Sequence, residues 1–192
     1  RLVVVAANNP AHQGYLNRSI QEIAEQLGTD PLDTLLDLSL AEQLELGFTM
    51  SLINTNPEVV ERLITQPDVL LGLSDAGAHV DQHCDAGMPT YLLHEWVHKR
   101  AAMTLEEGVR RLTSEPADFL GLHNKGRIAV GMDADLVLFD PATIRPLEPE
   151  WVSDLPAGKR RLVERAEGIA YTIVNGTVLF ADNVHQGEFP GH

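Results

Sequence analysis

The chain is poor in cysteine, in aromatic residues and in basic residues. Its single cysteine, Cys84, excludes an internal disulfide, which favours a reducing compartment, and we therefore expect a cytoplasmic protein. Only 14 Lys and Arg stand against 28 Asp and Glu, so the formal net charge is −14. Nucleic acids and anionic membranes both select clustered basic side chains. We therefore expect neither as a partner.

Long apolar runs are also missing. No run approaches the roughly 20 residues that span a bilayer, which excludes a transmembrane helix. The opening residues, Arg1-Leu2-Val3-Val4-Val5, contain neither a methionine nor the features of a signal peptide, and they resemble the middle of a domain. Hydrophobic residues make up 44% of the chain, which is enough to fill a globular core.

The first two thirds of the chain alternate strand-like apolar runs with amphipathic helical segments. The runs predict strands at residues 2–6, 48–53 and 69–73. Capping residues and apolar spacing predict helices at 19–27, 31–40, 57–65 and 89–103, with two more beginning near 104 and 114. An alternation of this kind favours a parallel α/β unit with right-handed crossovers.

The pattern changes after residue 122. Short β-type runs occupy residues 126–131 and 135–140, and Asn175-Gly176 predicts a type I′ turn joining strands 169–174 and 177–180. Residues 141–159 hold four prolines and should be irregular. We therefore expect one domain over residues 1–122 and a second, all-β domain over residues 123–192.

One segment, residues 72–79, combines a carboxylate, glycines and a histidine. Asp75 follows the apolar run and is succeeded by Gly77 and His79. α/β barrels present catalytic carboxylates in this way, at the carboxyl end of a strand. Ser-Asp-Ala-Gly is also an ordinary turn sequence, in which Ser74 would cap the turn and His79 would lie on the surface. Residue types alone leave both interpretations open.

Residues 94–98, His-Glu-Trp-Val-His, match the zinc peptidase motif His-Glu-x-x-His. On a helix this spacing places His94 and His98 one turn apart, with Glu95 as a general base. The alternative is a packing helix with the histidines at the edge of its apolar face. Third-ligand candidates occur downstream, but none lies in a recognisable second motif: Glu115, Asp118 and His123.

The loop at residues 79–85 mixes imidazole, thiolate and carboxylate groups, all of which bind zinc. Its spacing matches no structural zinc motif. Cys84 has neither a partner cysteine nor a neighbouring basic residue that would lower its pKa. We therefore expect this loop to line a site more readily than to form a metal site of its own.

Several segments together resemble a known family. They are residues 72–79, 89–97, 112–122 and, most specifically, 125–141, which reads Lys-Gly-Arg-Ile-Ala-Val-Gly-Met-Asp-Ala-Asp-Leu-Val-Leu-Phe-Asp-Pro. Residues 174–176 and 190–191 fit as well. The sequence resembles the C-terminal part of an amidohydrolase-superfamily enzyme, in the branch of N-acyl-D-amino-acid deacylases (D-aminoacylases).

The resemblance implies an α/β fold. Residues 1–122 would supply the last strands and helices of a TIM-like (β/α)8 metal-dependent hydrolase barrel, with a helical insertion at about residues 17–45. Residues 123–192 would supply strands of a small β-sandwich domain. In such barrels the active site lies at the carboxyl ends of the strands.

The resemblance also implies a function, which is hydrolysis of a linear or cyclic amide in a small-molecule substrate such as an N-acyl amino acid. One or two Zn²⁺ ions would polarise the carbonyl and activate water. Asp75 matches the family's strand-eight aspartate, a general base and then acid that in some members also contacts the metal. His79, Met50 and Ser74 would contact the substrate.

The sequence departs from the family in one important respect. The remaining metal ligands of the family, among them a His-x-His pair, lie on earlier strands and have no counterpart here. We therefore expect a C-terminal fragment that lacks zinc and activity on its own and needs the N-terminal part of the same enzyme. Open sheet edges would favour homo-oligomers of the isolated chain.

Two other functions stay open on the sequence. One is a small zinc peptidase that uses the 94–98 motif, and the other is a non-catalytic binding or oligomerisation module derived from an amidohydrolase. A His94→Ala variant separates the first from the amidohydrolase, because only the peptidase would lose its metal.

Overall fold

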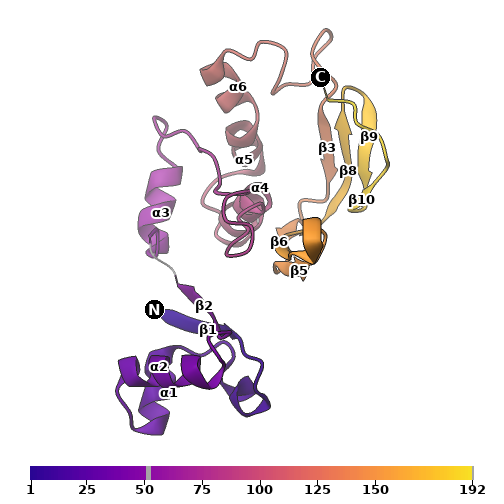
Figure 1. Ribbon diagram of the computed structural model, residues 1–192. Helices are drawn as coiled ribbons and strands as arrows, with labels where there is room; N and C mark the ends of the chain where they lie inside the picture. Colours follow the sequence, from indigo (N-terminus) through magenta and orange to yellow (C-terminus); the bar gives the residue numbers. More distant parts are fainter. Residues whose placement is uncertain (51–52, 192) are drawn as a thin grey trace. The chain divides into compact units, whose positions relative to one another are not determined.

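A computed structural model describes residues 1–50 and 53–191. The chain divides into two compact units, Arg1–Val60 and Glu61–His192. In Figure 1 the first unit runs from indigo to purple and the second from magenta to yellow. In the described ranges, no helix combines the length and the apolar character needed to cross a bilayer.

The first unit is built on a two-stranded antiparallel sheet of β1 (Leu2–Ala6) and β2 (Gly47–Met50). The predicted parallel unit is therefore wrong at this pair. Between the strands lie η1 (Pro10–Tyr15) and two helices, α1 (Ile20–Leu27) and α2 (Pro31–Ala41), which pack together. A helical hairpin begins and ends on the same side, so the chain enters β2 at the end where it left β1. Residues 51–52 of the predicted strand lie outside the described residues.

Local sequence signals explain both helices. Ser19 and Glu22 form a complete capping box at the start of α1, and Gly28 ends this helix with a φ of 69°. Asp30 caps α2 by accepting the N–H of Leu32. The apolar faces of these elements meet in one buried core: Val4, Ile20, Ile23, Leu38 and Leu46.

A buried carboxylate ties the end of α2 to the loop after β1. Glu42 is 3% exposed and accepts the backbone N–H groups of Asn8 at 2.8 Å and Asn9 at 3.1 Å. Nδ1 of His12 lies 2.6 Å from Oε1 of Glu42. Burial opposes ionisation of Glu42, but the hydrogen bonds from Asn8, His12 and Asn9 outweigh it and hold its pKa below the ordinary value.

We expect a Glu42→Ala variant to lower the melting temperature of the chain by several degrees at pH 7, because two backbone N–H groups and His12 lose their buried acceptor. The carboxylate contributes fully above its ordinary pKa of 4.5, and its contribution is lost as the pH falls through the lowered folded pKa. The difference between wild type and variant should therefore shrink in acid. Thermal unfolding followed by circular dichroism at pH 7 and pH 3 tests this, with Glu45→Ala, an exposed neighbour, as control. An equal difference at both pH values would contradict it.

Helices form the first half of the second unit, and the predicted helices are confirmed there. They are α3 (Pro57–Ile64), which begins just before the boundary between the units, α4 (Met88–Tyr91), α5 (Leu105–Leu112) and α6 (Ser114–Leu120). Between α4 and α5 runs η2 (Leu92–Lys99), which is π-helical, so the predicted helix at 89–103 ends at Lys99. Leu92, Leu93 and Trp96 on η2 are buried.

The second half of this unit is all-β. A four-stranded antiparallel sheet has the order β10-β9-β8-β3, formed by Val184–His185, Thr177–Ala181, Ile169–Val174 and Leu136–Phe139. The predicted hairpin is confirmed, with Asn175 and Gly176 at φ 48° and 77°. Two small antiparallel pairs accompany it, β4 (Arg145–Pro146) with β7 (Ala166–Glu167) and β5 (Glu150–Val152) with β6 (Arg161–Val163), and η3 (Pro156–Gly158) precedes β6.

Two predicted strands do not form. Residues 69–73 and 126–131 have no strand structure, and Ile128 and Val130 are 90% and 108% exposed. A strand is defined by its ladder of hydrogen bonds, and no partner strand lies beside these runs in the described part of the chain. Across residues 1–50 and 53–191 the strands form small sheets, and they form no closed barrel.

Candidate functional site

Asp75 lies on the wall of a cavity of about 420 Å³ in the second unit. Leu73 and Ser74, the two residues before Asp75, line the same cavity. The loop before α4 and the helix itself supply a second part of the wall, and the all-β half supplies a third. These further lining residues are Cys84, Asp85, Gly87, Met88, Tyr91, Pro146 and Glu164.

A tight turn presents the Asp75 side chain. The backbone carbonyl of Asp75 accepts the N–H of Ala78 at 3.2 Å, and Oγ of Ser74 accepts the N–H of Ala76 at 3.4 Å. Ser74 thus stabilises the turn, as one of the two sequence interpretations predicts, and it also lines the cavity. Asp75 is exposed, and its carboxylate accepts no hydrogen bond from the described residues. The carboxylate can therefore act on a bound molecule.

A buried arginine anchors the segment that leads to Asp75. Arg111 on α5 is 2% exposed and donates to the backbone carbonyls of Val69 at 2.9 Å and Gln66 at 2.7 Å. It also donates to Oε1 of Glu107 at 3.0 Å. These bonds satisfy carbonyl groups that a strand ladder would otherwise satisfy. Arg111 thus fixes the start of the run that ends at the cavity.

Glu107 joins Arg111 to its exposed neighbour Arg110. Arg110 donates to both carboxylate oxygens of Glu107, at 2.7 and 2.8 Å. The hydrogen bond from Arg110 is the largest influence, and together with Arg111 it overcomes burial and lowers the pKa of Glu107 to about 2. Glu107 is therefore ionised at every pH near neutrality. Over this range Arg111 keeps a charged hydrogen-bond partner.

The other predicted substrate contacts lie elsewhere. His79 is exposed, has a φ of 48°, and places its ring 6.1 Å from that of His83. His79 does not line the Asp75 cavity. Met50 ends β2 in the first unit and is half exposed. The roles of His79 and Met50 in substrate binding stay predictions.

Sequence reasoning missed the residues of the third wall. Glu164 and Pro146 follow Asp75 by more than 70 residues and belong to short strands or their edges. No local motif marks either residue. Tyr91 was noted only as part of the family resemblance, although its place one turn after Gly87 carries it to the cavity.

The 94–98 motif lies on η2, where its glutamate is paired with basic side chains. The rings of His94 and His98 stack with centroids 6.5 Å apart. Glu95 accepts a hydrogen bond from Arg100 at 2.8 Å, and this contact, assisted by Lys99 and opposed by burial, lowers its pKa. A carboxylate held ionised by two cations is a weak proton acceptor. The packing-helix interpretation agrees with buried Leu92, Leu93 and Trp96.

No group of three or more His, Cys, Asp or Glu side chains that could hold a metal ion occurs among the residues the structure describes. The 94–98 motif and the 79–85 loop thus bring no such group of three donors together among the described residues, and their metal interpretations stay predictions. A protein zinc site needs three or four protein ligands. Asp75 would supply only one of them.

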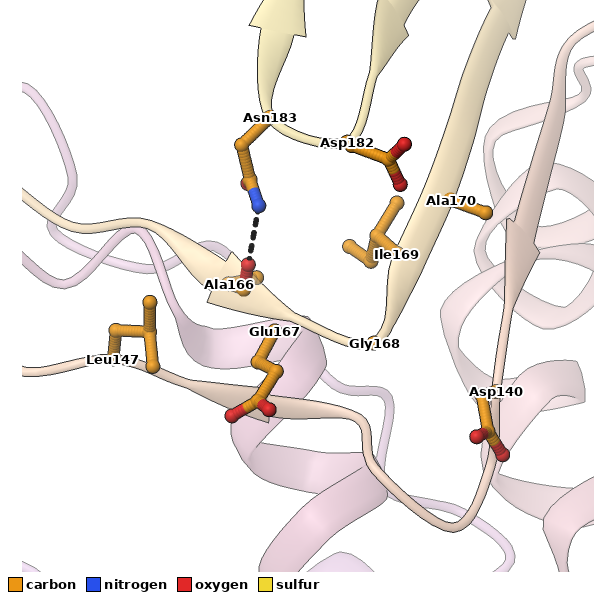
Figure 2. Close-up of a pocket in the computed structure, with 9 residues that line it drawn as sticks. All are labelled: Asp140, Leu147, Ala166, Glu167, Gly168, Ile169, Ala170, Asp182 and Asn183. Atoms are coloured by element: carbon orange, nitrogen blue, oxygen red, sulfur yellow. Dashed lines mark hydrogen bonds between the residues drawn. The ribbon is translucent and has the colours of Figure 1, made fainter.

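A second cavity, of about 430 Å³, lies in the all-β half (Figure 2). It holds three carboxylates, but two of them already have structural partners. Glu167 pairs with Arg145 at 2.6 Å, and Asp140 accepts the N–H of Ala142 at 2.9 Å. Asn183 donates to the carbonyl of Ala166 at 2.8 Å, which links the turn between β9 and β10 to β7 (Figure 2).

Comparison with solved structures defines the fold. The chain is similar to the crystal structure of a D-aminoacylase described as defining a novel subset of amidohydrolases, with a TM-score of 0.59 and 22% identity. The match covers 98% of this chain and 36% of that one. An N-acyl-D-glutamate deacylase from Bordetella bronchiseptica, complexed with zinc and a phosphonate inhibitor, is similar with a TM-score of 0.52 and 22% identity, over 93% of this chain and 34% of that one.

The sequence comparison defines the family. The amidohydrolase family model matches residues 7–180, so the chain belongs to the amidohydrolase family. Its relatives and structural neighbours place it in the D-aminoacylase-like branch, which confirms the resemblance seen in the sequence.

Three relatives show how much of a longer protein the chain matches. A D-aminoacylase of Alcaligenes xylosoxydans xylosoxydans is 27% identical over 176 residues, covering 91% of this chain and 33% of that protein. An N-acyl-D-glutamate deacylase of the same organism is 34% identical over 94 residues, covering 49% and 17%. An uncharacterized protein of Mycobacterium tuberculosis is 29% identical over 188 residues, covering 91% and 30%. The chain spans about a third of the length of such relatives.

Proposed function

We propose that this chain is the C-terminal part of a metal-dependent amidohydrolase that cleaves the amide bond of an N-acyl amino acid or a related linear or cyclic amide. Family membership supports the reaction class, and the deacylase relatives support the substrate class. The observation that carries the proposal is Asp75, an exposed carboxylate that lies on the wall of a cavity and accepts no hydrogen bond from the residues described.

The proposed organisation follows the family. Residues 1–122 contribute the last elements of a TIM-like barrel with a helical insertion at about residues 17–45, and residues 123–192 contribute strands of a small β-sandwich. The helical hairpin of α1 and α2 and the strands β3 to β10 support this division. The N-terminal part of the same enzyme would complete both domains, with the amide substrate as the small-molecule partner.

Asp75 would move the proton of the reaction. Its carboxylate accepts a proton from the attacking water as the new carbon–oxygen bond forms, and it then gives that proton to the leaving nitrogen as the carbon–nitrogen bond breaks. Ser74 and the turn to Ala78 hold the carboxylate at the cavity, and Arg111 holds the segment before it. His79 and Met50 are proposed to contact the substrate in the whole enzyme.

Zinc is the proposed cofactor of the whole enzyme. Of the similar structures, the deacylase is described as complexed with zinc, and a D-aminoacylase is described as having a binuclear metal center. The described residues of this chain do not supply a zinc site, because Asp75 is joined by no second or third ligand. We therefore propose that the chain alone binds no zinc at this site and is inactive.

We expect purified chain 1–192 to contain far less than one zinc per molecule, because a lone carboxylate does not retain the ion. Elemental analysis together with the intact mass of the same sample measures this. One zinc per chain that disappears in His94→Ala would contradict the expectation and restore the 94–98 motif as a site.

Activity tests the proposal directly. In the whole enzyme, release of free amine from N-acetyl-D-amino acids should depend on zinc, and chelation should remove it reversibly. A whole enzyme that releases no amine from any acyl amino acid or cyclic amide would overturn the proposed function.

A further inference from the structure

A glycine before α4 makes close contact with a glutamate far along the chain. The backbone N–H of Gly87 donates to Oε2 of Glu164 at 2.7 Å, across 77 residues of sequence. A Cβ on Gly87 would lie 2.3 Å from Oε1 of Glu164 and 2.8 Å from Cβ of Pro146. A larger side chain at position 87 would have to displace the Glu164 carboxylate and press against Pro146. Glycine at this position therefore permits the close contact between the two segments.

A second hydrogen bond holds the same loop nearer its start. The N–H of Leu162 on β6 donates to the carbonyl of Val80 at 2.7 Å. Residues 80–87 are therefore attached at both ends to β6 and the residue that follows it. Glu164 also places a carboxylate at the first turn of the helix that begins with Met88, where Gly87 provides no side-chain cap.

These contacts lie at the cavity that holds Asp75. Gly87, Glu164 and Pro146 all line it. Cys84 and Asp85, from the attached loop, line it too. A displacement of the loop would therefore change the shape of the cavity, while Arg111 would still hold the start of the segment that leads to Asp75.

We propose that Glu164 is a positioning residue of the substrate site: it fixes the loop of residues 80–87 against β6 and so sets the fit of the substrate beside Asp75. The part of this inference that concerns substrate rests on the proposed function. The all-β half thereby contributes residues to the wall of the substrate site, in addition to forming a sheet.

Hydrogen exchange of the 1–192 chain tests the loop contact without any activity. Glu164→Ala should accelerate exchange of the residue 80–87 amides by roughly tenfold or more, because Gly87 loses its acceptor and the loop opens more often. Glu164→Gln keeps an amide oxygen that can accept this bond and should restore most of the protection. Glu148→Ala, at an exposed neighbouring glutamate, is the control and should exchange like the wild type.

A double-mutant cycle tests the pairing of the two residues. Gly87→Ala should destabilise the chain and open the loop, because its Cβ displaces the Glu164 carboxylate. In the Glu164→Ala background the same substitution should cost clearly less. Additive effects on loop exchange would overturn the direct contact.

Kinetics of the whole enzyme test the consequence for substrate. Glu164→Ala should raise KM about tenfold and leave kcat within about twofold, since Asp75 keeps its anchor. Glu164→Gln should recover most of the affinity. Unchanged exchange in Glu164→Ala would overturn the contact, and faster exchange with an unchanged KM would overturn the positioning role. A wild-type enzyme without amide hydrolysis would instead overturn the proposed function, while the exchange experiment would still decide the contact.

Discussion

Replacing Asp75 by Asn in the whole enzyme is expected to lower kcat for amide hydrolysis by about two to four orders of magnitude, the usual contribution of a positioned acid–base group. The amide has nearly the shape of the carboxylate but cannot accept and return a proton at neutral pH. The turn should survive, because Ala78 bonds to the backbone carbonyl of residue 75 and Ala76 bonds to Ser74. The effect should therefore fall on kcat rather than on folding.

The matched control for Asp75→Asn is Asp81→Asn. Asp81 is an exposed aspartate of the same long loop and does not line the cavity. It should leave kcat within about twofold, as expected for a surface position. Steady-state kinetics on one N-acyl amino acid, with circular dichroism of each variant, separates chemistry from folding. A whole enzyme in which Asp75→Asn retains wild-type kcat would assign the proton transfer to another residue.

Replacing Arg111 by Met is expected to lower the free energy of unfolding by about 1–3 kcal/mol, the cost of leaving partly buried hydrogen-bonding groups without their charged donor. Met fills much of the volume but cannot donate to the carbonyls of Val69 and Gln66. Two backbone acceptors and Glu107 would then lose the donor that the buried guanidinium supplies. Arg111→Lys should recover a part of this loss, since an ammonium reaches fewer acceptors than the forked guanidinium.

Arg110 offers a control on the adjacent position of the same helix. Its side chain is 44% exposed although it contacts the same Glu107 and also Glu115. Arg110→Ala should destabilise the chain much less than Arg111→Met, as is typical of exposed ion pairs. Urea unfolding of the 1–192 chain measures both variants. Equal effects at positions 110 and 111 would show that the backbone contacts of Arg111 contribute little.

Features that depend on neighbours in the sequence could be predicted accurately. Ser19 with Glu22 forms the expected capping box, and Asp30 begins the next helix as expected. Asn175-Gly176 forms the expected turn between two strands. Each of these depends on the conformation of a few adjacent residues and on hydrogen bonds that close within one turn.

Features that depend on a partner far away in the sequence could not be predicted accurately. Residues 69–73 and 126–131 have the composition of strands but form none, because apolar composition does not supply a neighbouring strand to bond with. The parallel arrangement predicted for the first unit is replaced by the antiparallel pair β1 and β2. The sequence predicted both runs as strands. Whether the two strands run parallel or antiparallel depended on how α1 and α2 return the chain.

The sequence by itself determined the family, the helices with their caps, the hairpin, and Asp75 as the residue of most interest. Tertiary structure decided what surrounds Asp75. Arg111 reaches carbonyls 42 and 45 residues away, and Glu164 meets Gly87 across 77 residues. The physical reason is that a motif records the conformational preferences of adjacent residues, whereas the wall of a cavity consists of contacts made by whichever segments the packed core brings together.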